Sequence, residues 1–448
     1  MHPTIALLLC ILFISIVLII DFKQRPNVAT ALWVPFIWMM YCGSKGLSRW
    51  LNLSPEYTVT AFDYTKGSPI DRTFLAILIV IGLIILYKRR IAWSEIFKRN
   101  VWILILFLYM AVSILWSDLP GLSFKRWIRT VGDLIMVLII MTDDNPLESI
   151  KVMFRRSAFV LLPLSILFIT YFRHIGVIYS ANGLMEMWVG VTTHKNDLGY
   201  LVMAYGIYFL WNILINRNSE KKYVDVLFLI MAIFLLMGSP TSSSKTSILI
   251  FILGTCILIY AYLFKSYMKY IGRIILVIFI FFFFLNYSSI IFFHSSLLEK
   301  VATSSGRDIT LTGRTQIWKE IFDIASSSCF FGKGYRSFWI GEVTLSNDSG
   351  EQFVPIKQSH NGYIDIYLEL GLLGLFIFLC LVISEYRNIR RTLMIDFEYG
   401  IMRMTFFFMI LLHNLSESSF ARPNHFLWFI FLLVIFNTWH RHDSVKTI

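Results

Sequence analysis

Long apolar runs, nearly free of charged positions, recur along the chain from one end to the other. Each covers roughly 15 to 20 residues, the length of helix that crosses about 30 Å of hydrocarbon. Lipid offers the backbone no hydrogen-bond partner, so continuous apolar runs favour helices over barrel strands, in which polar and apolar residues alternate. The pattern predicts an all-α polytopic transmembrane bundle.

Candidate spans lie near residues 4–20, 28–43, 73–87, 101–116, 130–141, 157–171, 197–215, 224–238, 246–264, 274–292, 363–384, 404–415 and 425–439. Three of these runs are short, which makes the expected count twelve or thirteen: 28–43, 130–141 and 404–415. We interpret the first run as a retained span because no Lys or Arg precedes it and no small-residue cleavage site follows it.

Composition agrees with a membrane protein and excludes a water-soluble core of this size. The chain is 57% hydrophobic and 15% charged, with a mean hydropathy of +0.68, whereas soluble domains carry about 25% charged residues. The net charge of +12 raises the alternative of nucleic-acid binding. The basic residues, however, lie mainly in short connections, as the positive-inside rule predicts. We therefore expect no nucleic-acid partner.

The basic connections also predict an orientation. Alternating sides from the cluster at 88–99 makes the other basic connections and the C-terminus cytoplasmic: 142–156, 216–223, 265–273 and 385–403. The one long connection, 293–362, is then periplasmic. We expect an N-terminal transmembrane bundle at 1–292, this large loop, and C-terminal transmembrane helices at 363–448.

The long loop has features of a folded segment, since loops of this length are usually functional or disordered. Apolar positions around Ile317, Ile321 and Ile324 recur at helical spacing, which predicts an amphipathic helix at 313–326 near the membrane surface. Gly332 and Gly334 indicate a tight turn. The stretch 342–353 is expected to be a mobile acidic tip.

A candidate anion site stands at the start of that amphipathic helix, in Thr312-Gly313-Arg314-Thr315. A cation at a helix N-terminus opposes the helix dipole, at a cost of roughly 0.3 to 1 kcal/mol. Bound phosphate would reverse that sign, and backbone N–H groups, hydroxyls and an arginine fork suit a phosphate. The alternative is a solvated surface arginine that pairs with Asp308.

A candidate general base is His360, in Gln358-Ser359-His360-Asn361-Gly362-Tyr363. We predict Ser359 as the N-cap of the following span, which would place His360 in the first helical turn at the outer face. The helix dipole and nearby cations favour a neutral imidazole there, and a neutral imidazole can accept a proton. The alternative is an interfacial histidine without a catalytic role, like His425 or His174.

Further polar groups stand at span ends on the same outer face. They include Arg173, Lys195 in His194-Lys195-Asn196, Lys245 in Ser242-Ser243-Ser244-Lys245, Arg336, and Glu417 in Ser416-Glu417-Ser418. Each alone is more often a snorkelling or capping residue. Together they would form a cationic vestibule at the level of lipid headgroups.

Other chemistries lack their signatures in the sequence. Four of the five cysteines fall within spans and only Cys329 lies in the long loop, so we expect no disulfide within that loop and no metal site. No Walker-type glycine loop and no carboxylate cluster is present. We therefore expect no cofactor, no ATP hydrolysis and no proton relay through the membrane.

These motifs resemble the bacterial O-antigen ligase and polysaccharide polymerase family. The residues that carry the resemblance are Thr312-Gly313-Arg314 with Trp318, His360-Asn361-Gly362-Tyr363 leading into Glu369-Leu370-Gly371-Leu372-Leu373-Gly374, and Ser242-Ser243-Ser244-Lys245. Gly67 to Arg72 and Trp188 to Asn196 look like the exopolysaccharide-polymerase branch. Lys245 departs from the pattern, because many relatives have arginine there.

The resemblance implies an inner-membrane glycosyltransferase that acts at the periplasmic face without a metal. Its donor would be an oligosaccharide on undecaprenyl pyrophosphate, its acceptor a glycan, and its partner proteins a chain-length regulator and a flippase. His360 and Arg314 would be catalytic, with the pyrophosphate or glycan bound by a wider set: Lys245, Lys195, Arg336, Arg173, Thr312 and Glu417.

We predict a polysaccharide polymerase that extends an exopolysaccharide or O-antigen by block transfer. One alternative is a ligase that passes the glycan to a lipid A core or a protein, using the same residues. The other is a lipid-linked glycan flippase or transporter, which needs polar residues within the spans, where each charge costs about 2.5 to 3.5 kcal/mol.

Overall fold

The structure is a computed structural model of the 448-residue chain. It describes residues 1–25, 28–51, 68–180, 183, 185–216, 222–267, 270–277, 280, 318, 321–340, 344–345, 354–355 and 358–437. The proposed site residues Thr312 and Arg314, the start of the amphipathic helix and most of the acidic tip lie outside these residues.

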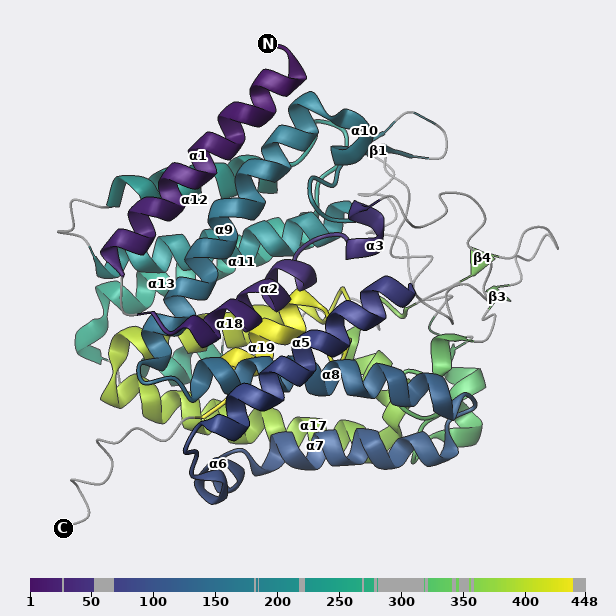
Figure 1. The fold of residues 1–448 in the computed structure, drawn as a ribbon. Coiled ribbons are helices and arrows are strands. Elements are labelled where there is room, and N and C mark those ends of the chain that lie inside the picture. Colours follow the sequence, from purple (N-terminus) through teal and green to yellow (C-terminus); the bar gives the residue numbers. More distant parts are fainter. Residues whose placement is uncertain are drawn as a thin grey trace, which may run out of the picture.

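Most long helices run between the two ends of a bundle, the left and right sides of Figure 1. The longer ones are α1 (Pro3–Gln24), α5 (Pro69–Lys88), α7 (Val101–Val112), α8 (Pro120–Met141), α9 (Pro146–Tyr171), α11 (Lys195–Ile215), α12 (Lys222–Met237), α13 (Lys245–Leu263), α17 (Gly362–Ile395) and α18 (Phe397–His413). Shorter ones are α2 (Trp33–Cys42), α3 (Leu47–Trp50), α6 (Trp93–Arg99), α10 (Arg173–Gly176) and α19 (Phe426–Ile435).

The predicted all-α membrane bundle is confirmed. Each predicted apolar run coincides with all or part of a helix, except 274–292, which lies mostly outside the described residues. In the described part, six helices are long and apolar enough to cross a membrane, or seven if the bent pair formed by α6 and residues 101–116 is one span. Length and composition together give fewer spans than the twelve or thirteen predicted, for example because α12 and α18 have 16 and 17 residues and α8 carries charged residues.

Several helices extend beyond the predicted runs. α8 begins at Pro120 rather than near 130, and α9 begins at Pro146 rather than near 157. In α9, Arg155 and Arg156, placed in a connection from the sequence, are helical and buried by neighbouring helices. Hydropathy cannot place such residues in a helix because it assumes contact with lipid.

α19, one of two apolar helices with ten residues, lies in the core. All ten residues of α19 are buried, and Phe431 stacks against Phe407 of α18 with ring centroids 6.1 Å apart. α1 is the opposite case, with only 11% of its most apolar stretch buried. α19 therefore forms the centre of the bundle, and α1 presents most of its surface outward.

The predicted glycine turn fills a break in α17. Gly371 has φ 68° and ψ −170°, which interrupts the helix. The turn inserts there: Lys333 and Gly334 donate backbone hydrogen bonds to the carbonyls of Leu368 and Glu369, at 3.1 and 2.9 Å. Gly332 and Gly334 have positive φ, and a Cβ at Gly332 would lie 2.5 Å from the Glu369 backbone. This contact fixes residues 332–334 of the long loop on the transmembrane bundle.

Two small hairpins, absent from the sequence prediction, lie on the right of Figure 1. β1 (Val177–Tyr179) pairs antiparallel with β2 (Glu186–Trp188), and β3 (Thr344–Leu345) pairs with β4 (Val354–Pro355). Of the amphipathic helix, residues 321–325 are helical, and Ile321 and Ala325 pack against Ile364 and Leu368 of α17. The described part of that helix thus rests on the start of α17.

Thiol labelling tests the predicted orientation. Cys329 is exposed in the long loop, and the basic connections place that loop outside. An impermeant maleimide applied to intact cells should therefore modify Cys329 in a variant that keeps only this cysteine. A serine at position 329 is the control. Labelling that requires permeabilised cells would reverse the orientation.

Candidate active site

The start of α17 positions His360, although not as predicted. Asn361 is the N-cap: its side-chain oxygen accepts from the backbone N–H groups of Tyr363 and Ile364 at 3.0 and 3.2 Å. The prediction of Ser359 as N-cap is wrong, because its hydroxyl donates to the Asn361 carbonyl instead. His360 therefore precedes the helix, with φ 54°. Positive φ at a non-glycine residue is uncommon and often accompanies function.

The His360 ring lies in a cluster formed by Gln358, His360, Glu417 and Asn196, which we call the histidine cluster. His360 Nδ1 lies 3.2 Å from Gln358 Nε2 and 3.4 Å from Glu417 Oε2. Asn196 donates to the other oxygen of Glu417 at 2.8 Å. The imidazole is only partly buried, so it is held on one edge and remains accessible.

Cations at the starts of two helices adjoin the histidine cluster. Lys195, the first residue of α11, donates to Ser242 at 2.7 Å, and it lies within electrostatic range of Glu417 and Lys245. Lys245 begins α13 and is exposed. The hydroxyl of its neighbour Thr246 lies 3.1 Å from that of Ser416. The structure thus brings His360, Glu417, Lys195 and Lys245 together from four separate elements.

An arginine layer, formed by Arg126, Arg336 and Arg422, borders the same region. Arg336 holds Glu369 of α17 in two ways: its backbone N–H and its Nη1 each donate to a carboxylate oxygen at 3.1 Å. Arg126 of α8 donates to the Arg336 carbonyl at 2.6 Å. Burial would lower the pKa of Arg336, but the charges of Glu369, Tyr335 and Asp365 raise it above its usual value. Arg336 is therefore charged and already paired.

Arg422 differs from Arg336 in its hydrogen-bond acceptors. Its Nη1 donates to Gln358 Oε1 at 2.6 Å and to the Ser418 carbonyl at 2.9 Å, which are both neutral acceptors. Burial, and next the charge of Arg336, lower the pKa of its guanidinium. A bound anion would oppose both effects. The arginine layer is thus suited to a pyrophosphate beside His360.

Two other histidines form part of the packing beneath this region. The His425 ring packs against Tyr200 with ring centroids 4.8 Å apart and the ring planes tilted by 40°, and His413 meets the same tyrosine edge-on at 6.0 Å. This packing of His425 was not predicted from the sequence. His174 is exposed, as expected of an interfacial histidine.

One predicted residue lies in a different group. Arg173 in α10 donates to Glu186 at 2.6 Å and to the Tyr179 hydroxyl at 3.1 Å, on the β1–β2 hairpin. The hydrogen bonds that Arg173 donates to Tyr179 and Glu186 raise the pKa of Arg173. The described contacts thus tie Arg173 to the hairpin rather than to His360.

Sequence reasoning missed Arg126, Arg422 and the positioning role of Asn196. A signal was present for the two arginines, because both lie at the predicted outer side, against the charge bias. Among the described residues, no group of three His, Cys, Asp or Glu side chains has the arrangement of a metal site.

Comparison with known proteins supports the resemblance. A family model described as O-antigen ligase matches residues 226–379, which include the histidine motif and the α17 break. The chain is 26% identical over 309 residues to the exopolysaccharide production protein ExoQ of Rhizobium meliloti (strain 1021), covering 67% of this chain and 68% of the relative. The resemblance to the O-antigen ligase and polysaccharide polymerase family is thereby confirmed.

Proposed function

We propose that this protein is a membrane glycosyltransferase that polymerises lipid-pyrophosphate-linked oligosaccharides at the periplasmic face. The observation that carries the proposal is a histidine joined through Gln358 to a half-buried arginine layer, in a chain similar to an exopolysaccharide production protein. The coarser role, transfer of glycans as a polymerase or ligase, has support from both comparisons.

In the proposed reaction, a hydroxyl of the acceptor glycan attacks the anomeric carbon of the donor. The new C–O bond forms as the bond to the pyrophosphate oxygen breaks, and the lipid pyrophosphate leaves with the electron pair. His360 accepts the hydroxyl proton. The arginine layer, with Lys195 and Lys245, stabilises the negative charge that develops on the leaving group. No step requires a metal ion or a cofactor.

Glu417 is proposed to set the tautomer of His360. Arg422 donates a hydrogen bond to Gln358 Oε1, so the Gln358 NH₂ group faces His360 Nδ1. Glu417 Oε2 lies near the same nitrogen and accepts a hydrogen bond from it when Nδ1 carries the proton. When Nδ1–H faces the carboxylate, the lone pair is on Nε2, which can then receive the proton. Such hydrogen bonds are often long in free enzymes and shorten once substrate is bound.

Replacing Glu417 by Gln should slow transfer and leave donor binding intact. The amide can still accept from Asn196 but carries no charge to stabilise the imidazolium. Hydrogen bonds to charged groups contribute about 1.5 to 3 kcal/mol, or roughly 10- to 150-fold in rate. Turnover and donor affinity of the purified variant are the measurements. Glu186→Gln, at an outer carboxylate paired with Arg173, is the control; equal losses in both variants would contradict the role.

Arg314 tests the anion site proposed from sequence. Arg314→Lys keeps the charge but loses the two-pronged geometry, so it should impair polymer formation almost as much as Arg314→Ala. Polymer yield at matched expression is the measurement. Wild-type polymer from both variants would make Arg314 a surface residue.

A ligase remains the second candidate, because the matching family model is described as O-antigen ligase. Glycan chain length in a deletion strain separates the two. Loss of polymer with accumulation of single lipid-linked repeats is expected of a polymerase. Polymer that is made but stays on the lipid carrier would identify a ligase, and repeats retained at the cytoplasmic face would identify a flippase.

A further inference from the structure

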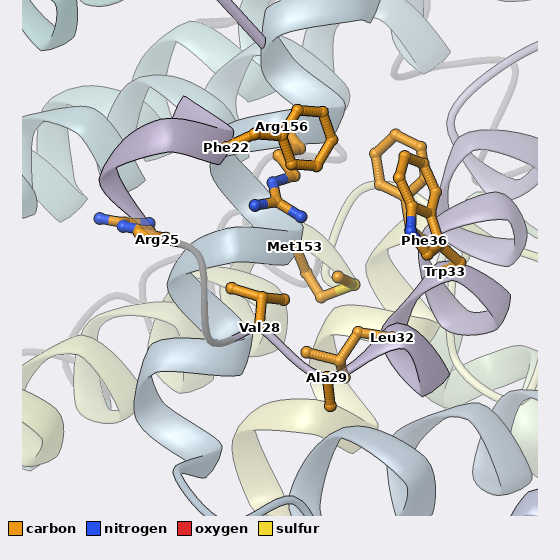
Figure 2. A pocket seen from close by; sticks show the side chains of 9 residues that line it. All are labelled: Phe22, Arg25, Val28, Ala29, Leu32, Trp33, Phe36, Met153 and Arg156. Atoms are coloured by element: carbon orange, nitrogen blue, oxygen red, sulfur yellow. The ribbon is translucent and has the colours of Figure 1, made fainter. Parts of the chain in front are cut away.

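A cationic pocket lies at the end of the bundle opposite the candidate active site. It is a cavity of about 240 Å³ between the end of α1, the start of α2 and the first half of α9. Arg25 and Arg156 line it together with Phe22, Trp33, Phe36 and Met153. Figure 2 shows the Arg156 guanidinium between Arg25 on one side and Trp33 and Phe36 on the other. The pocket wall thus combines two cations with aromatic and aliphatic surface.

The arginines of this region share one buried carboxylate. Asp21 of α1 lies 2.7 Å from Arg156 Nε, 3.4 Å from Arg155 Nε and 3.9 Å from Arg25 Nη1. Arg155 also meets Asp225 of α12 at 3.2 Å. Arg25 pairs in addition with Glu148 at 2.9 Å. The described ion pair of Arg156 is with Asp21, which it shares with the other two arginines, although its guanidinium carries five N–H donors.

Arg156 has donor capacity left. Its side chain is only 6% exposed, its guanidinium stacks 4.1 Å from the Phe22 ring, and its Nη2 is buried without a hydrogen-bond partner. A buried donor without a partner is unfavourable, and an arginine fork prefers a phosphate or carboxylate. The pocket therefore presents an unused anion-binding group.

The surroundings of the pocket favour a lipid as the source of the anion. α1 exposes large apolar side chains along most of its length, including Ile16, Ile19 and Ile20 close to the pocket. Trp33 is 47% exposed at the pocket wall. The basic connections assign this end to the cytoplasm, where the membrane leaflet carries anionic lipids. A phosphate between the two arginines would thus have space for acyl chains along α1.

We propose that this pocket binds the phosphate headgroup of an anionic phospholipid, with its acyl chains along α1 and Trp33. Arg25 and Arg156 bind the phosphate, and the bound lipid fastens α1, the least buried helix, to α9. The site is separate from the proposed transferase chemistry and does not depend on it.

The test measures lipid binding to the purified full-length protein in neutral detergent. Native mass spectrometry and thermal unfolding are followed while phosphatidylglycerol, phosphatidylcholine or inorganic phosphate is added. Phosphatidylglycerol should bind and raise the unfolding temperature at concentrations where the other two do neither. Ala29→Trp fills the cavity without removing a charge, and Arg25→Gln removes one cation; both should weaken phosphatidylglycerol binding at least tenfold.

Arg90→Gln is the matched control, because Arg90 is exposed at the same end of the bundle. It should bind phosphatidylglycerol as the wild type does. An equal effect of phosphatidylcholine would overturn the proposal, and so would binding of inorganic phosphate in place of lipid. Unchanged phosphatidylglycerol binding in Ala29→Trp, which leaves the ion pairs of Asp21 intact, would also overturn it.

Discussion

Replacing His360 by Gln should slow glycan transfer roughly 10²- to 10⁴-fold, which is the usual contribution of a general base. Glutamine preserves a polar side chain of similar reach, but it cannot accept the proton of the attacking hydroxyl. The arginine layer and Lys195 remain in place, so the lipid-linked donor should bind as tightly as before. Donor binding and product formation are measured separately on the purified protein.

The control for this variant is His174→Gln. His174 is exposed in α10, next to Arg173, which contacts the β1–β2 hairpin. It should tolerate the substitution. His425 is a poor control because its ring packs on Tyr200. Near-normal turnover by His360→Gln would remove this residue from the mechanism.

Replacing Arg336 by Met should destabilise the protein by about 3 to 5 kcal/mol, because it leaves Glu369 buried without its charged partner. The side chains of Arg336 and Glu369 are 14% and 4% exposed. The pair joins the long loop to α17 beside the Gly371 break. The free energy of unfolding in bicelles is the measurement.

The double variant Arg336→Met with Glu369→Leu separates folding from function. Removing both charges should recover most of the lost stability, since replacing a whole buried ion pair by apolar groups is often neutral. It should not recover transfer, because the arginine layer has lost a cation. Wild-type turnover by the double variant would limit Arg336 to a structural role.

The sequence predicted the helices well wherever lipid contact and an apolar run coincide, as in α1, α5 and α13. It missed the polar N-terminal stretches of α8 and α9. In α9, Arg155 and Arg156 are helical and buried because their charges meet partners from other helices, such as Asp21 with Arg156. The α17 break at Gly371 was not predicted, because nothing local in a Leu-Gly-Leu-Leu-Gly run indicates that a turn 40 residues earlier inserts there.

The candidate site was predicted in its residue types rather than in its geometry. His360, Glu417, Lys195 and Lys245 stand at helix ends on one face, and topology alone brings such ends together. The cap was assigned wrongly because Ser359 and Asn361 are both good N-cap types and stand only two positions apart. Arg422 escaped notice because its importance depends on Gln358, 64 positions away in the chain.

The most direct test of the account uses purified protein with a lipid-pyrophosphate oligosaccharide donor and excess chelator. Product length and release of lipid pyrophosphate are followed together. The account predicts glycans of several repeats, one lipid pyrophosphate released per bond formed, and no loss of rate with chelator. Transfer that stops on chelation, or wild-type protein that binds donor but forms no glycosidic bond with any glycan acceptor, would contradict it.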